Sequence, residues 1–256
     1  MRNDLYRRHF YVNKSIETLI NNEIIEYDMK SAGISIIESK ELLSEEEIEL
    51  LKSMPKELRN VKIGNLQKHN KDLVKKLNEG FTEYRKMFIE ANDLDINDII
   101  SIKKDAIFTT KRCNEKEFDK VRFDEKNIYT SYYYFKNGIE IYYNKNKMDV
   151  KGINDDKIKE HKKYFGSFIN RFCFMGETSS LSNRIKFLNE FTYMYKTRNL
   201  NVNYYREFNA NSLFRSFDTL TGLDVALTKI GKLKPEEVDI KYNFFNYLVP
   251  MINMMI

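Results

Sequence analysis

The chain has 256 residues, of which 42% are hydrophobic and 14% aromatic, enough for one sizeable domain or two small ones. Its 43 basic and 38 acidic residues give a net charge of +5, which is compatible with a polyanionic partner. The sequence has no apolar run of membrane-spanning length and no signal-peptide block at its start, so we expect a cytoplasmic protein without a membrane partner. Its two cysteines, Cys113 and Cys173, have no pairing pattern or zinc-site spacing, and we expect reduced thiols.

The first predicted elements are a strand, a turn and a helix. Residues 24–37 set the carboxylate of Asp28 among apolar, strand-like side chains, which predicts a strand that enters a turn at residues 31–33. A helix is expected from Ser44, because Ser44 and Glu47 have the spacing of a capping box. The acidic residues 45–47 favour the same start through the helix dipole.

A long amphipathic helix is expected over residues 66–91. Its apolar side chains recur at three- and four-residue steps, the spacing of one buried stripe: Leu73, Leu77, Phe81, Tyr84, Phe88 and Ala91. The basic residues lie largely off this stripe: Lys68, Lys71, Lys75, Lys76, Arg85 and Lys86. Two interpretations of these cations stay open, namely a solvated face or contacts with a triphosphate or nucleic-acid backbone.

Two hairpins follow. Residues 99–102 and 106–109 predict strands joined by a tight turn, which puts the carboxylate of Asp105 at or next to the hairpin tip. Residues 129–135 and 139–143 flank Asn137 and Gly138, a pair suited to the positive φ angles of a tight hairpin turn. The alternating tyrosines of this second hairpin either pack in a sheet or stack on bases. Beyond it, residues 158–195 predict two helices broken near residues 176–180.

Three segments of the chain carry a recognisable pattern. Asp28, Ser31, Ser35, Ile36 and Ile37 fit the first palm motif of family B DNA polymerases, which runs Asp, two variable residues, Ser, Leu, Tyr, Pro, Ser, Ile, Ile. Residues 103–108, Lys-Lys-Asp-Ala-Ile-Phe, resemble that family's Asp-Thr-Asp-Ser-Ile-Phe hairpin. Residues 149–153 resemble the strand and Lys-Gly segment that follows the hairpin and faces the primer. The likeness covers residues 24–153, about half of the chain.

The resemblance implies a two-metal site. Two Mg²⁺ ions, or Mn²⁺ in their place, would stabilise the attacking and leaving oxygens of an in-line displacement, and such ions need bridging carboxylates. By resemblance, Asp28 and Asp105 are that catalytic pair, with the main-chain carbonyl of Met29 as an additional ligand. The resemblance also implies nucleotide contacts at Gly33, Lys71, Lys75 and Lys76. It implies nucleic-acid contacts at Lys104, Lys151 and Gly152.

The chain departs from the family pattern at several positions. Gly33 stands where the family has the tyrosine that screens the sugar 2′ position, so if nucleotides bind here we expect discrimination against ribonucleotides by that side chain to be lost. Lys103 replaces the first aspartate of the hairpin motif, and no Lys-x₃-Asn-Ser-x-Tyr-Gly segment is found. Few residues precede Asp28, so we expect neither the exonuclease nor the amino-terminal domain.

The expected fold is α+β, with an antiparallel palm-like sheet, packed helices and a helical C-terminal subdomain. Residues 1–153 would form the palm-like domain, with a helical, fingers-like insert at about residues 40–95. Residues 154–256 would form a helical thumb-like or partner-binding region. Its apolar end, residues 244–256, suits a docking helix or a surface for a replication-protein partner.

The leading hypothesis is a metal-dependent nucleotidyltransferase that acts on nucleic-acid ends, with DNA, or RNA, and nucleoside triphosphates as partners. A second hypothesis is a non-catalytic palm-like protein that binds nucleic acid or a replisome. The third is a nuclease, because residues 28–30, Asp-Met-Lys, fit half of a restriction-type metal site, with Glu17 as an upstream carboxylate and Lys30 essential. The many Asn, Lys and Ile residues suggest an AT-rich, phage-like genome, and so a protein of the bacterial or infected-cell cytoplasm.

Overall fold

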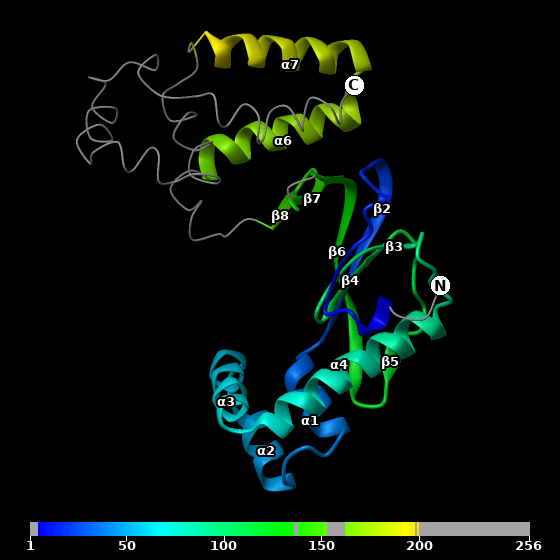
Figure 1. Ribbon diagram of the computed structural model, residues 1–256, viewed down its shortest axis with the longest axis vertical. Helices are drawn as coiled ribbons and strands as arrows, with labels where there is room; N and C mark the ends of the chain where they lie inside the picture. The colour runs from blue at the N-terminus through cyan, green and yellow to red at the C-terminus, as the bar shows by residue number, and fades with distance from the viewer. Residues whose placement is uncertain (1–4, 136–137, 153–161, 198, 200–256) are drawn as a thin grey trace, which may run out of the picture. The chain divides into compact units, whose positions relative to one another are not determined.

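A computed structural model describes residues 5–135, 138–152, 162–197 and 199 (Figure 1). The fold is α+β, as expected, and its strands pair in antiparallel fashion. The chain forms two compact units. Unit 1 comprises Met1–Ile16 and Glu23–Ile128, and unit 2 comprises Glu17–Asn22 and Tyr129–Ile256. The predicted boundary near residue 153 stays a prediction, because residues 153–161 lie outside the described part.

The sheet of unit 1 positions the candidate site. Its strands are ordered β1-β3-β4-β2-β6, and β5 pairs with β6. Strands β2 and β6 also contribute residues to unit 2. The bounds are β1 Phe10–Val12, β2 Thr18–Met29, β3 Ile99–Lys103, β4 Ala106–Thr109, β5 Glu117–Phe118 and β6 Val121–Tyr134. The hairpin predicted around Asp105 is thereby confirmed as β3 and β4.

Helices α1–α4 complete unit 1, and α1, α2 and α3 gather at the N-terminal end of α4 (Figure 1). They span Ala32–Ser39, Glu45–Ser53, Lys56–His69 and Lys71–Ala91. The predicted capping box is present, because the Ser44 hydroxyl accepts from the Glu47 amide and the Glu47 carboxylate accepts from the Ser44 amide. The strand ends at Met29 and the chain turns at residues 30–31, close to the predicted turn, but the strand-like residues 34–37 that followed it were wrongly interpreted, because they form α1. Ser31 has a φ of 49°, and this left-handed residue turns the chain into α1.

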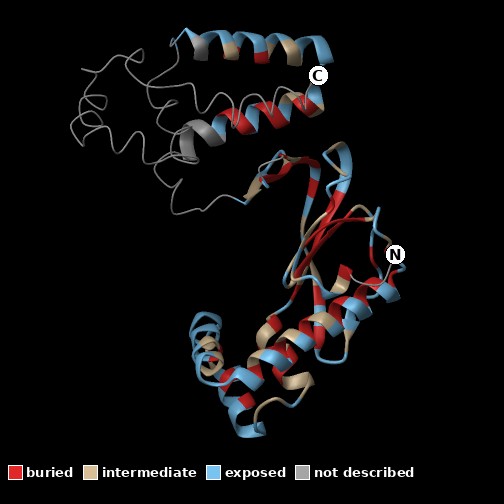
Figure 2. Cartoon of the chain, viewed as in Figure 1, coloured by how far each residue is buried: buried red, intermediate tan, exposed pale blue. Residues whose placement is uncertain are grey.

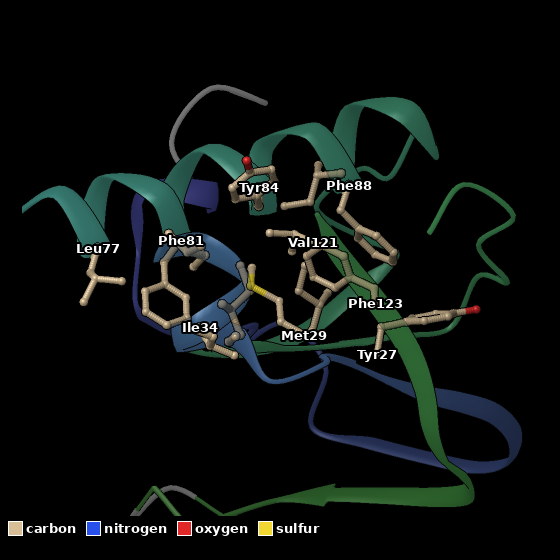
Figure 3. Packing of buried hydrophobic residues seen from close by; sticks show 14 of the residues in the cluster. Tyr27, Met29, Ile34, Leu77, Phe81, Tyr84, Phe88, Val121 and Phe123 are labelled. Atoms are coloured by element: carbon tan, nitrogen blue, oxygen red, sulfur yellow. The ribbon is translucent and has the colours of Figure 1, made fainter. Parts of the chain in front are cut away.

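The helix predicted over residues 66–91 was also wrong as one element. Asn70 separates α3 from α4, and its side chain accepts a hydrogen bond from the Leu73 amide at 3.0 Å, an N-cap of α4. The predicted stripe is buried from Leu73 to Phe88, whereas Ala91 is exposed. Figure 2 shows which residues of α4 are buried, and Figure 3 shows this side packing on residues of β2 and β6; the rings of Phe88 and Phe123 are stacked with centroids 4.3 Å apart.

Gly80 allows α4 to approach α1 closely. A Cβ at this position would lie 2.4 Å from Cγ2 of Ile36, which is fully buried and stiff because it is β-branched. Gly80→Ala should therefore lower the free energy of unfolding by about 1–2 kcal/mol, since overpacking outweighs the gain in helix propensity. Gly64→Ala is the matched control, because nothing lies within 4 Å of its added Cβ, and it should be neutral or stabilising. Urea unfolding of both variants decides this; equal effects would contradict the close approach.

Within the described residues, unit 2 contains the second predicted hairpin and two helices. Strands β6 and β7 (Glu140–Asn144) pair as expected, and β8 (Lys147–Lys151) pairs with β7. Helices α6 (Lys162–Thr178) and α7 (Leu181–Lys196) break where the sequence indicated. Tyrosines of the hairpin are packed rather than available to bases: Tyr129, Tyr132, Tyr133, Tyr142 and Tyr143 are buried. The predicted docking segment at residues 244–256 lies outside the described residues.

Candidate metal and phosphate site

A cleft of about 710 Å³ opens in unit 1 at the C-terminal end of β2. It is lined by the β2–α1 turn, the β3–β4 turn, a stretch of β6, one face of α3 and Phe81 of α4. Both predicted catalytic aspartates line it, together with Lys30, Gly33 and Lys104. The cleft therefore contains both of the aspartates that the sequence predicted as metal ligands.

The antiparallel pairing of β2 with β4 brings the two aspartates together. Asp28 lies opposite Ala106, and the Met29 amide donates to the main-chain carbonyl of Asp105 at 2.9 Å. The side chain of Asp28 is 26% exposed, and burial raises its pKa, with the neighbouring charges of Asp105 and Glu26 acting in the same direction. The acidic side chains of Asp28 on β2 and Asp105 in the β3–β4 turn thus share one partly buried environment.

The donor set suits a hard cation without enclosing it. Carboxylate oxygens are the ligands that Mg²⁺ prefers, and this ion commonly keeps several positions for water and phosphate oxygens. Within the described ranges, no group of three or more His, Cys, Asp and Glu side chains is arranged to hold a metal. Met29 is buried and binds Asp105 through its amide, so the predicted role of its carbonyl stays a prediction.

Two further residues, Lys126 and Glu26, lie beside Asp28, and neither is predicted from the sequence as part of the site. The Lys126 ammonium lies 3.1 Å from Asp28 Oδ2 and 3.8 Å from Glu26 Oε1, and its charge lowers the pKa of Asp28. The Asn127 amide donates to the Glu26 carboxylate. Alternation along β2 puts residues 26 and 28 on one face, but no sequence signal indicated that β6 would lie beside them.

Arg85 braces the hairpin that carries Asp105. The sequence placed this residue off the buried stripe, but it is fully buried, which corrects the solvated interpretation. Its guanidinium donates to the main-chain carbonyl of Tyr6 at 2.9 Å, to that of Lys104 at 2.6 Å and to the Thr82 hydroxyl at 3.3 Å. Burial lowers the pKa of Arg85 to about 10, while the charge of Asp105 opposes that shift. The N-terminal segment and the β3–β4 hairpin thus cover Arg85, which the hydrophobic spacing of the helix alone predicts to be exposed to solvent.

Helix α3 supplies polar groups that the sequence also missed. Lys56, Asn60 and Gln67 recur along one face of α3 and line the cleft. Arg59 donates to the Ser31 hydroxyl at 3.2 Å, and its Nε is buried with no hydrogen-bond partner among the described residues. The Ser31 side chain does not cap α1, so the first turn of α1 meets the cleft through Ala32 and Gly33. The N-terminus of α1, with the cations Lys56 and Arg59 beside it, is suited to binding anions.

Gly33 lies between α1 and α3. A Cβ at Gly33 would lie 3.5 Å from Cδ1 of Ile63, an ordinary contact, so the glycine is not forced by packing. Gly33 and Ile63 both line the cleft, and the missing side chain of Gly33 leaves open space there. Lys104 has a φ of 56° at the hairpin turn, and its ammonium lies 4.9 Å from the ring centroid of Phe81.

The other predicted cations lie elsewhere. Lys71 and Lys75 line a separate hollow of about 650 Å³ together with Tyr6 and His9. Lys76 pairs with Asp72 at 2.9 Å. None of the three lysines lines the cleft at Asp28, so their proposed phosphate contacts stay predictions without support from the cleft.

Lys151, Gly152 and Glu17 belong to unit 2. Gly152 has a φ of 84°, and an added Cβ would lie 2.3 Å from the Gly138 carbonyl oxygen, which gives this glycine a local structural reason. The Glu17 carbonyl accepts from the Tyr134 amide at 2.8 Å. The nuclease hypothesis adds Lys30 and Glu17 to Asp28. Of these two residues, Lys30 lines the cleft and Glu17 does not.

Comparison with known proteins gives a family. The chain belongs to the bacteriophage PBS1 gene 130 protein family, whose model matches residues 1–256. This agrees with the phage-like source expected from composition. No curated protein matches the chain. Among the described residues, no helix is long and apolar enough to cross a membrane.

Proposed function

We propose that this member of the bacteriophage PBS1 gene 130 protein family is a divalent-metal-dependent nucleotidyltransferase, similar to a minimal family B DNA polymerase palm. The observation that supports it most is the meeting of Asp28 and Asp105 at one end of two paired strands, in a cleft that also holds anion-binding groups. The two residues come from the two sequence motifs that resemble the polymerase palm, so pattern and geometry agree on the same pair.

Each part of the cleft then has a role. Asp28 and Asp105 hold Mg²⁺ or Mn²⁺, and the metal, when bound, offsets negative charge on the reacting phosphate. The first turn of α1 and Lys56, which line the cleft, bind the phosphates of an incoming nucleoside triphosphate, and Arg59 holds Ser31 at the start of that turn.

The proposed partners are a nucleic-acid end and nucleoside triphosphates. Lys104 would contact the nucleic-acid backbone from the hairpin turn, and Lys151 and Gly152 would do so from unit 2. Gly33 leaves room beside the sugar, so ribonucleotides should be accepted as well as deoxyribonucleotides. A replication protein bound through residues 154–256, and action in the cytoplasm of an infected bacterium, complete the proposal.

One observation favours the non-catalytic alternative. No group of three or more metal-type ligands is found among the described residues, and Lys126 already pairs with Asp28. The other lysines that line the cleft, Lys30, Lys56 and Lys104, could contact a nucleic-acid backbone without a metal. The nuclease alternative depends on Lys30, which is exposed and lines the same cleft.

Extension of a labelled DNA primer–template by the full-length protein separates these functions. The reaction should contain Mg²⁺ or Mn²⁺ and either deoxyribonucleotides or ribonucleotides, with a chelator as the blank. Metal-dependent lengthening supports the transferase. Metal-dependent shortening that disappears in Lys30→Met, but not in Lys120→Met, identifies a nuclease instead; Lys120 is exposed in the β5–β6 turn and does not line the cleft. Template binding that survives chelation with neither product leaves the non-catalytic palm.

A further inference from the structure

Lys126 is a cation in direct contact with the candidate metal site. It extends from β6, and its ammonium lies within hydrogen-bond distance of Asp28 and 3.8 Å from the Glu26 carboxylate. Its side chain is 52% exposed, whereas that of Glu26 is 5% exposed. The ammonium therefore links a buried acid to an acid that faces the cleft.

The local charge balance explains why a cation is held there. Three carboxylates, those of Glu26, Asp28 and Asp105, interact around this end of β2, and repulsion between them opposes ionisation of Asp28. The Lys126 ammonium offsets part of that repulsion. Asn127 donates to the other Glu26 carboxylate oxygen, Oε2, without adding charge.

We propose that Lys126 is the resident counter-cation of this site, holding Asp28 while no divalent ion is bound and giving way when one binds. It thereby sets the divalent-ion concentration at which the site fills. The inference rests on the proposed function, because it takes Asp28 and Asp105 as metal ligands. An ammonium bound to a ligand oxygen opposes an incoming divalent ion by like charge. Lysine can give way because its flexible stem is half exposed.

Titration of the full-length protein with Mn²⁺, followed by the electron paramagnetic resonance signal of the free ion, tests the competition. Lys126→Met keeps the stem and removes the charge, and should lower the Kd for Mn²⁺ by about tenfold, the scale for one half-exposed charge beside a divalent ion. Lys126→Arg keeps the charge and should stay close to the wild type. Lys120→Met is the control. Lys120 is exposed in the β5–β6 turn and does not line the cleft, so this variant should leave the Kd for Mn²⁺ unchanged.

Thermal unfolding gives a second measurement that does not depend on activity. Without metal, Lys126→Met should unfold below the wild type, because the carboxylates lose their counter-charge. With saturating Mn²⁺ the difference should close or reverse. A purely structural role for Lys126 gives the same difference with and without metal, and that result overturns the proposal.

The titration also separates this inference from the proposed function. If Lys126→Met binds Mn²⁺ no more tightly than the wild type, while Asp28→Asn abolishes binding, Lys126 is not a competitor and the proposed function stands. If Mn²⁺ binding survives Asp28→Asn, or no variant binds Mn²⁺, the metal site itself is wrong and both fail.

Discussion

Asp28→Asn and Asp105→Asn are each expected to slow primer extension by at least about 10³-fold. A metal ion contributes several kcal/mol of charge stabilisation in a transition state, and each 1.36 kcal/mol is a factor of ten in rate. An amide oxygen is a weaker ligand than a carboxylate, so either variant should lose the ion that we propose the pair binds. Asp124→Asn is a matched control, because Asp124 lines the same cleft but pairs with Arg122 at 2.5 Å.

The stability of Asp28→Asn separates loss of a ligand from loss of the fold. Burial raises the pKa of Asp28, so the folded protein favours the neutral carboxyl. This contribution to stability is present below the ordinary carboxyl pKa and is lost as pH rises through the raised pKa. Near neutral pH the neutral Asn should therefore unfold at an equal or higher temperature than Asp in metal-free buffer, and the gap should vanish in acid. Joint loss of activity and stability would mean misfolding.

Arg85→Met should lower the free energy of unfolding by about 2–4 kcal/mol, the largest stability effect expected in unit 1. The variant leaves the carbonyls of Tyr6 and Lys104 without their donor, and each unsatisfied buried group costs about 1–3 kcal/mol. Release of the buried charge offsets part of this, since burial already opposes ionisation of Arg85.

Urea unfolding measures the Arg85 effect, and Lys86→Met is its control on the next residue of α4. Lys86 is exposed and its pair with Glu90 spans 3.8 Å, so that variant should change stability by less than about 0.5 kcal/mol. Arg85→Lys should also weaken Mn²⁺ binding while the protein is folded, because a lysine cannot hold both carbonyls beside the hairpin. Equal Mn²⁺ affinity in Arg85→Lys and wild type would limit Arg85 to stability.

The strand pattern predicted the site better than the helix pattern did. Asp28 and Asp105 could be placed because each lies at the end of a short apolar run, and antiparallel pairing of such runs brings their ends together. The turn at residues 31–33 was expected, but the apolar residues 34–37 suit a strand as well as a helix, so α1 was missed. Hydrophobic spacing continued through Asn70 and hid the break between α3 and α4.

The missed site residues share one cause. Arg59, Arg85 and Lys126 are cations whose roles come from partners far along the chain: Ser31, Lys104 and Asp28. Periodicity assigns a face of an element and cannot say which element will cover it. A charged residue on an uncovered face and one on a covered face therefore have the same local sequence.

The sharing of β2 and β6 between the two units has a consequence for the gene. Neither unit is encoded by one uninterrupted stretch, since unit 1 lacks residues 17–22 and unit 2 includes them. A stop codon after residue 128 would deprive residues 17–22 of the rest of their unit, and one crossover within the gene cannot exchange one unit without also exchanging part of the other. We expect the two halves to be inherited together, and mosaic exchange to fall outside the reading frame.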